Sequence, residues 1–140
     1  MKILAFVSAF LFSLSLLAGV NTEGGKAVKG YDVVEYFKSK SAVKGSSEFS
    51  HTYGGAQYDF SSKANLEDFK KNPERYVPQY GGYCAYAVSQ GYTYGIDPEA
   101  FDVRNDKLYL NANKSVQRTW RGNAANFIVD ADKNWPGLNK

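Results

Sequence analysis

Aromatic residues alternate with polar ones in two short runs near the middle of the chain. The runs lie on either side of a Gly-Gly pair and carry aromatic residues at even spacings, at Phe49, Tyr53, Tyr58 and Phe60. Even spacing places side chains on one face of a strand, and Gly54-Gly55 tolerates the positive φ values of a two-residue hairpin turn. The pattern predicts a β-hairpin over residues 48–60 with one half-buried face.

A second hairpin and several short helices are predicted in the rest of the chain. Apolar residues on both sides of Asn105-Asp106 favour a hairpin over residues 100–110 that turns at this pair. Apolar residues three or four positions apart, preceded by Ser, Asp or Asn as N-caps, predict the helices. One short helix is expected to follow Asp32, which has capping-box spacing with Glu35. The others are expected near residues 62–71, 83–90, 114–121 and 123–133, with caps at Ser61 or Ser62, Asn113 and Asn123.

These elements predict a small single α+β domain in which two β-hairpins pack against several short helices. The chain has 140 residues, which is enough for one domain with a modest core. Trp120 and Trp135 each close an apolar stripe on a predicted helix, so both are expected to be largely buried. His51, which lies between Phe49 and Tyr53, is expected on the opposite, solvated face of the first hairpin.

The start of the chain has the pattern of a signal peptide. Lys2 precedes a long apolar run through Leu17, and the small residues Ala18-Gly19 follow. The expected division of the chain is a signal peptide at residues 1–20, a polar, Gly-rich linker at 21–29 and a domain at 30–138. We therefore expect an exported protein, periplasmic or extracellular. A retained N-terminal anchor is the alternative, because no A-x-A cleavage site is present.

Charge and cysteine content exclude some classes of function. The formal charge is +3, and it becomes +2 without the signal peptide, where Lys2 is the only charged residue. Acidic and basic residues are interspersed, so no basic stripe or motif indicates nucleic-acid binding. Cys84 is the only cysteine and cannot form an internal disulfide, so packing alone must stabilise the domain.

Cys84 and the only histidine, His51, are the candidates for thiol and metal chemistry. Cys84 lies in a segment rich in tyrosine and glycine, whose side chains and backbone suit a partly polar pocket. The candidate ligand-binding residues are Tyr80, Tyr83, Cys84 and Tyr86, and the candidate metal ligands are Cys84 and His51. Burial of Cys84 as a small hydrophobic residue is the structural alternative.

Several motifs resemble the YHS domain, a small metal-associated module. The resemblance lies in the order Tyr53-Gly54, Tyr58-x-Phe60-Ser61-Ser62, Phe69 and Pro73-x-x-Tyr76. It extends to a longer, secreted-type branch of the family through GYDVV at residues 30–34, PQYGGYCA at 78–85 and KLYLN at 107–111. The resemblance implies a binding or accessory domain that associates with a metal ion.

The chain departs from the family in its metal ligands. Metal-associated YHS domains place cysteines after the Tyr-x-Phe strand, where this chain has Ser61-Ser62. A closed zinc site needs four N or S ligands, and this chain offers two at most. A low-coordinate Cu(I) ion suits one thiolate and one imidazole better, so copper is the metal expected at Cys84 and His51.

The sequence leaves three functions open. The first is an exported YHS-like binding or accessory domain that holds a metal ion or small ligand near Cys84. The second is a structural or protein-interaction domain without a small-molecule site. The third is a thiol enzyme with Cys84 as nucleophile, which lacks support because no signature of an oriented base or oxyanion hole accompanies this residue.

Overall fold

The computed structural model describes residues 19–140 of the chain. Residues 1–18 of the expected signal peptide lie outside this range, so that expectation rests on the sequence alone. None of the helices in the described range is long and apolar enough to cross a membrane.

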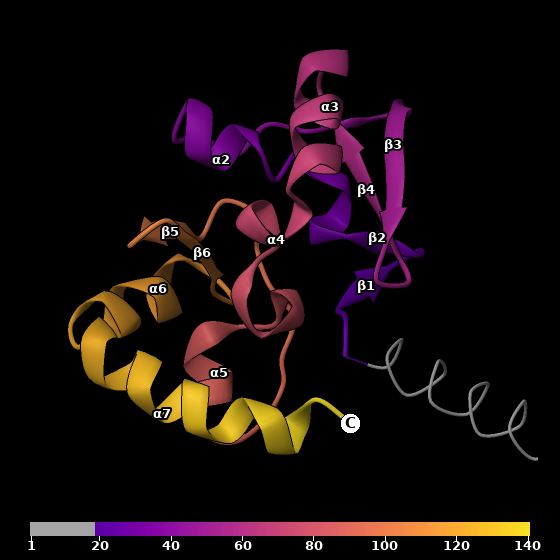
Figure 1. Cartoon of the computed structure of the whole chain (residues 1–140). Helices are drawn as coiled ribbons and strands as arrows, with labels where there is room; N and C mark the ends of the chain where they lie inside the picture. The colour runs from indigo at the N-terminus through magenta and orange to yellow at the C-terminus, as the bar shows by residue number, and fades with distance from the viewer. Residues whose placement is uncertain (1–18) are drawn as a thin grey trace, which may run out of the picture.

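The described chain is an α+β fold of two small sheets and short helices (Figure 1). Strands β1–β4 lie with α2 and α3 at one end of the molecule, α5–α7 lie at the other end, and α4 lies between them. The strands are β1 (Thr22–Glu23), β2 (Lys26–Ala27), β3 (Ser46–Tyr53), β4 (Ala56–Phe60), β5 (Phe101–Arg104) and β6 (Lys107–Leu110). The helices are α2 (Glu35–Lys38), α3 (Lys63–Lys71), α4 (Pro73–Tyr76), α5 (Ala85–Ser89), α6 (Lys114–Arg121) and α7 (Ala124–Leu138), and short 3₁₀ turns η1 (Val28–Gly30) and η2 (Gln79–Gly82) connect them.

Both predicted hairpins are confirmed. Strands β3 and β4 pair antiparallel, with a register shift between Ser46 and Ser50, and β5 pairs with β6. All four turn residues have positive φ, as primed turns require: Gly54 58°, Gly55 85°, Asn105 51° and Asp106 60°. The larger sheet has the strand order β1-β2-β4-β3, so β3 forms one of its edges.

The predicted linker at residues 21–29 is wrong, because this segment belongs to the larger sheet. Strands β1 and β2 pair across a turn at Gly24-Gly25, and β2 runs parallel to β4. Lys26 places its Nζ atom 2.8 Å from the carboxylate of Asp59, which is buried. Glycines that resemble a flexible linker in the sequence instead form a tight turn.

The predicted helices are present, with differences at their ends. The hydroxyl of Ser62 accepts a hydrogen bond from the backbone N–H of Asn65 at 3.1 Å and so caps α3. Asn113 caps α6 in the same way. Asn123 precedes α7 as predicted but does not cap it, because its side-chain oxygen accepts from the side chain of Asn126 instead. Helix α7 continues beyond the predicted end at residue 133 to Leu138.

Two apolar clusters form the core. Phe69 lies at the centre of the first, and its ring packs against aromatic rings of β3, β4 and α4. The second cluster joins α5, α6 and α7 around Trp120, which is 0% exposed, as predicted. Trp135 lies at the edge of this cluster, against Tyr80 and Tyr83, and is less completely buried than Trp120.

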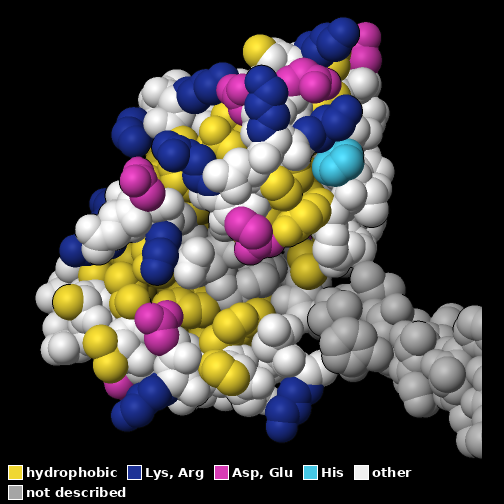
Figure 2. Space-filling view, viewed as in Figure 1, with side chains coloured by type: hydrophobic (Ala, Val, Ile, Leu, Met, Phe, Trp, Pro, Cys, Tyr) yellow, Lys and Arg dark blue, Asp and Glu magenta, His cyan; other side chains and the backbone are white. Residues whose placement is uncertain are grey.

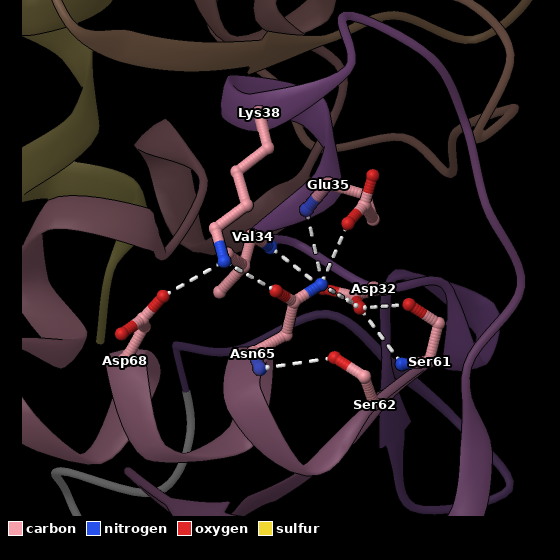
Figure 3. A network of polar contacts seen from close by, with 8 residues as sticks. All are labelled: Asp32, Val34, Glu35, Lys38, Ser61, Ser62, Asn65 and Asp68. Atoms are coloured by element: carbon pink, nitrogen blue, oxygen red, sulfur yellow. Dashed lines mark hydrogen bonds and ion pairs between the residues drawn. The ribbon is translucent and has the colours of Figure 1, made fainter.

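A buried carboxylate joins α2 to α3 (Figure 3). Asp32 is 0% exposed, and its Oδ1 atom accepts hydrogen bonds from the backbone N–H groups of Val34 at 2.8 Å and Glu35 at 3.2 Å. Its Oδ2 atom accepts from the backbone N–H and the hydroxyl of Ser61 and from the side-chain amide of Asn65, at 2.7–2.8 Å. The return half of the predicted capping box is absent from residues 19–140, because Glu35 instead accepts from Asn65.

Replacement of Asp32 by Asn is expected to destabilise the fold by about 2–4 kcal/mol. Each carboxylate oxygen accepts from at least two donors, so either orientation of the amide points its hydrogens at other donors. Urea unfolding followed by circular dichroism measures the loss. Asp68→Asn is the matched control, because Asp68 is 39% exposed and pairs with Lys38 alone. Equal shifts of the two midpoints would contradict the role of Asp32.

Candidate functional site

Cys84 lies in the interior, directly before α5. It is 1% exposed, and its thiol donates a hydrogen bond to the side-chain oxygen of Asn111 at 3.5 Å. The same oxygen accepts from the backbone N–H of Tyr86 at 3.0 Å, and Asn111 is itself fully buried. The thiol therefore packs as a small buried side chain, and a substrate reaches it only if the surrounding residues move.

His51 lies on the same face of β3 as Phe49 and Tyr53. The prediction of an opposite, solvated face is wrong, because residues two apart along a strand point to the same side. The His51 ring is partly buried and packs edge-on against Phe69, with 6.2 Å between ring centroids. Its environment is therefore the aromatic cluster of the first hairpin.

Cys84 and His51 have different neighbours in the structure. Cys84 contacts Asn111, which follows β6, whereas His51 packs against α3. Within residues 19–140, no group of three or more His, Cys, Asp or Glu side chains is arranged to hold a metal ion. A two-ligand copper site at Cys84 and His51 therefore stays a prediction from the sequence.

The three candidate tyrosines pack in the same apolar cluster but have different polar surroundings. Tyr83 packs against Trp135, and Tyr86 packs against Phe127. Tyr80 is 5% exposed, and its hydroxyl donates to Asp132 of α7 at 2.9 Å. Tyr80 also has a φ of 58° and a ψ of 38°, a left-handed conformation that is rare for an aromatic residue. Such residues gather at functional sites, where surrounding contacts hold the strain.

A cavity of about 700 Å³ lies beside Tyr80. It is bounded by the tip of the first hairpin, by the chain from α4 to η2 and by α7, and its main side chains are Tyr53, Tyr58, Glu74, Tyr80, Asp132 and Trp135. These elements lie on the face drawn in Figure 2, where hydrophobic side chains are exposed between acidic and basic ones. Of the four predicted ligand-binding residues only Tyr80 lines the cavity, and Tyr83, Cys84 and Tyr86 do not.

Two carboxylates of the cavity are held by tyrosine hydroxyls. The hydroxyl of Tyr53 donates to Glu74, and that of Tyr80 donates to Asp132. No basic residue lines the cavity in the described chain. The cavity therefore combines aromatic walls with local negative charge.

The tyrosines of the cavity stay neutral over a wide pH range. Burial raises the pKa of Tyr58, with a smaller contribution from Glu74. Burial and the hydrogen bond to Asp132 raise the pKa of Tyr80, and the hydrogen bond to Glu74 raises that of Tyr53. Near neutral pH each hydroxyl is therefore a hydrogen-bond donor, and the carboxylates carry the charge.

A family model of the YHS domain matches residues 34–80. This stretch is similar to a YHS domain. No curated protein and no solved structure matches the chain at a significant level. The YHS domain supplies the hairpin wall of the cavity and ends at Tyr80, while Asp132 and Trp135 of α7 come from outside it.

Sequence reasoning missed most residues of this cavity. Tyr53 and Tyr58 stand out in the sequence only as members of the hairpin core. Glu74 and Asp132 are 58 positions apart by their numbers, and no motif links them. The one usable signal is the glycine-rich segment after Tyr80, which indicates an unusual backbone where a cavity can form.

The thiol of Cys84 is expected to resist alkylation in the native protein. Its reaction with a maleimide should be at least about a hundredfold slower than in denaturant, because labelling requires opening of the core. Mass spectrometry of samples quenched at successive times measures the rate of labelling. A Cys84→Ala, Thr52→Cys double variant places a thiol at an exposed position of β3 and should label at once. Equally fast labelling of both proteins would show that Cys84 is accessible.

Stability is expected to fall above pH 10, where the buried tyrosines of the folded chain resist ionisation. Their raised pKa values mean that the unfolded chain releases protons first, so stability is complete below the ordinary tyrosine pKa of about 10 and is lost as pH rises further. Tyr58→Phe removes one such hydroxyl and keeps the ring. Urea midpoints across this pH range should decline less steeply in the variant, and superimposable declines would contradict the assignment.

Proposed function

We propose that this protein is an exported binding protein of the secreted YHS type. Its YHS domain and α7 together hold a small organic ligand in the cavity beside Tyr80. The observation that carries the proposal is the cavity itself, a hollow of about 700 Å³ with aromatic walls. Ligand sites in proteins typically measure about 300–1,000 Å³, with mostly apolar walls and a few placed polar groups.

The position of the cavity supports this proposal. Tyr53 and Tyr58 belong to the first apolar cluster, and Tyr80 and Trp135 belong to the second. Ligand sites occur preferentially where two packed units meet. A compound in the cavity would contact both clusters at once.

The backbone around Tyr80 supplies a second argument. Tyr80, Gly81 and Gly82 are three consecutive residues with positive φ. A Cβ atom at Gly81 would lie 2.0 Å from the carbonyl oxygen of Gly19 and 3.2 Å from the Trp135 ring. The left-handed conformation of Tyr80 is unfavourable for an aromatic residue, and such conformations gather at functional sites. Its position in the cavity wall is consistent with a role in binding.

Export is supported by the sequence, through Lys2 and the apolar run that follows it. Val20 packs against the core. Gly19 is also buried and lies beside Gly81. We therefore propose that cleavage occurs before Gly19 and not after Val20. Mass spectrometry of the protein recovered from outside the cytoplasm identifies the first residue of the mature chain.

The two other functions have less support. A thiol enzyme and a copper site both depend on Cys84, which is 1% exposed and contacts Asn111. A protein-interaction domain without a small-molecule site is the outcome if the cavity takes no ligand.

Aromatic compounds of fragment size are expected to bind in the cavity. In ¹H–¹⁵N NMR spectra, a panel of cationic, neutral and anionic compounds should shift the amide signal of Gly81 and the indole signal of Trp135 for at least one member. Trp135→Ala should weaken this binding about tenfold or more, because the ring forms part of the wall.

Phe127→Ala is the matched control. Phe127 lies on the same helix and is also partly buried, but it packs against Tyr86 and does not line the cavity. Its replacement should leave the binding unchanged. A panel in which no compound shifts either signal would overturn the proposed function.

A further inference from the structure

We propose that the ligand of this cavity is an organic cation, an amine or quaternary ammonium compound that carries an apolar group. This inference rests on the proposed function and specifies its ligand. The cavity presents two carboxylates, aromatic rings and, in the described chain, no basic side chain.

The negative charge is a local property of the cavity. The whole chain carries a formal charge of +3, so an acidic hollow does not follow from the composition. A second cavity, of about 460 Å³, has the opposite character and is lined by Lys40, Lys114, Arg118 and Arg121 together with two acidic residues. Glu74 and Asp132 form no ion pair with another described residue. Their charges are therefore available to a bound cation.

The two carboxylates of the cavity disfavour an anion. The hydroxyls of Tyr53 and Tyr80 already donate to them. An anionic ligand would be repelled by both carboxylates and could not accept from these two hydroxyls. A cation meets the free lone pairs of the same carboxylates.

The aromatic walls favour an organic cation over a metal ion. Tyr53, Tyr58, Tyr80 and Trp135 line the cavity, and ring faces attract ammonium groups within about 6 Å. A metal ion of the hard type needs six or more oxygen ligands, whereas residues 19–140 supply two carboxylates to this space. The volume also exceeds what a bare ion fills.

Three probes that share one ring separate charge from shape: benzyltrimethylammonium, benzyl alcohol and benzoate. The protein is expressed from the full sequence and purified after any processing by the cell. It is then titrated with each probe at low salt, and binding is followed through the NMR signals of Gly81 and Trp135. The cation is expected to bind at least about fivefold more tightly than benzyl alcohol, with benzoate weakest. Raising the salt to about 0.5 M should weaken binding of the cation alone, because the carboxylates are exposed and screened.

Two charge-removing variants test the carboxylates. Glu74→Gln and Asp132→Asn are each expected to weaken binding of the cation about two- to fivefold. Neither should change the affinity for benzyl alcohol. Asp130→Asn on the same helix is the matched control, because Asp130 is exposed but does not line the cavity. It should change neither affinity.

The outcomes distinguish this inference from the proposed function. Two results would overturn the proposal of a cationic ligand and leave the proposed ligand site standing. One is equal affinity for the three probes, measured at Gly81 and Trp135. The other is cation binding that is unchanged in both carboxylate variants. Absence of binding by all three probes overturns both. The salt dependence of the unaltered protein keeps the test decisive if a variant fails to fold.

Discussion

The buried carboxylate of Asp32 is the contact on which the arrangement of α2, α3 and the first hairpin depends. A charge removed from water is tolerated only when hydrogen bonds replace its hydration, and here backbone and side-chain donors of three segments supply them. The carboxylate fixes the first turn of α2 beside the start of α3. Helix α3 carries Phe69, whose ring anchors the hairpin that forms one wall of the cavity. The geometry of the candidate site thus depends on a group that lies outside it.

The cavity belongs to the YHS domain and to the helices that follow it. The hairpin supplies Tyr53 and Tyr58, and α7 supplies Asp132 and Trp135. Tyr80 connects the two parts, because it ends the YHS domain, packs with Trp135 and donates to Asp132. A YHS domain alone would therefore present half of this site. The C-terminal helices complete the candidate site.

The sequence predicted features that depend on neighbouring residues. Gly54-Gly55 and Asn105-Asp106 each specify a turn through their own backbone preferences, and Ser62 specifies a helix start. Features that depend on distant partners were missed. The segment at 21–29 becomes part of a sheet only because β4 lies beside it, and Asn123 finds a side-chain partner in place of the backbone. The burial of Cys84 was weighed as an alternative, but its partner Asn111 has no local signal.

The cavity is the clearest case of this limit. Its two carboxylates and its aromatic walls come from segments separated by most of the domain. Their spacing along the chain does not predict that they lie close together, because it is the packing of α7 against η2 that brings them together. Only Tyr80, with its glycines, was recognisable as a site residue beforehand.

The outer strand of the larger sheet has a consequence for how separate copies of the chain meet. Strand β3 is an edge strand, and its unpaired backbone groups would otherwise invite other chains to pair with it. Its outward residues are polar, with Glu48 among them, and the register shift between Ser46 and Ser50 distorts the regular ladder. Irregularity and charge at an edge are devices that block intermolecular sheet growth. The strand that borders the cavity thus also carries two features that oppose edge-to-edge pairing.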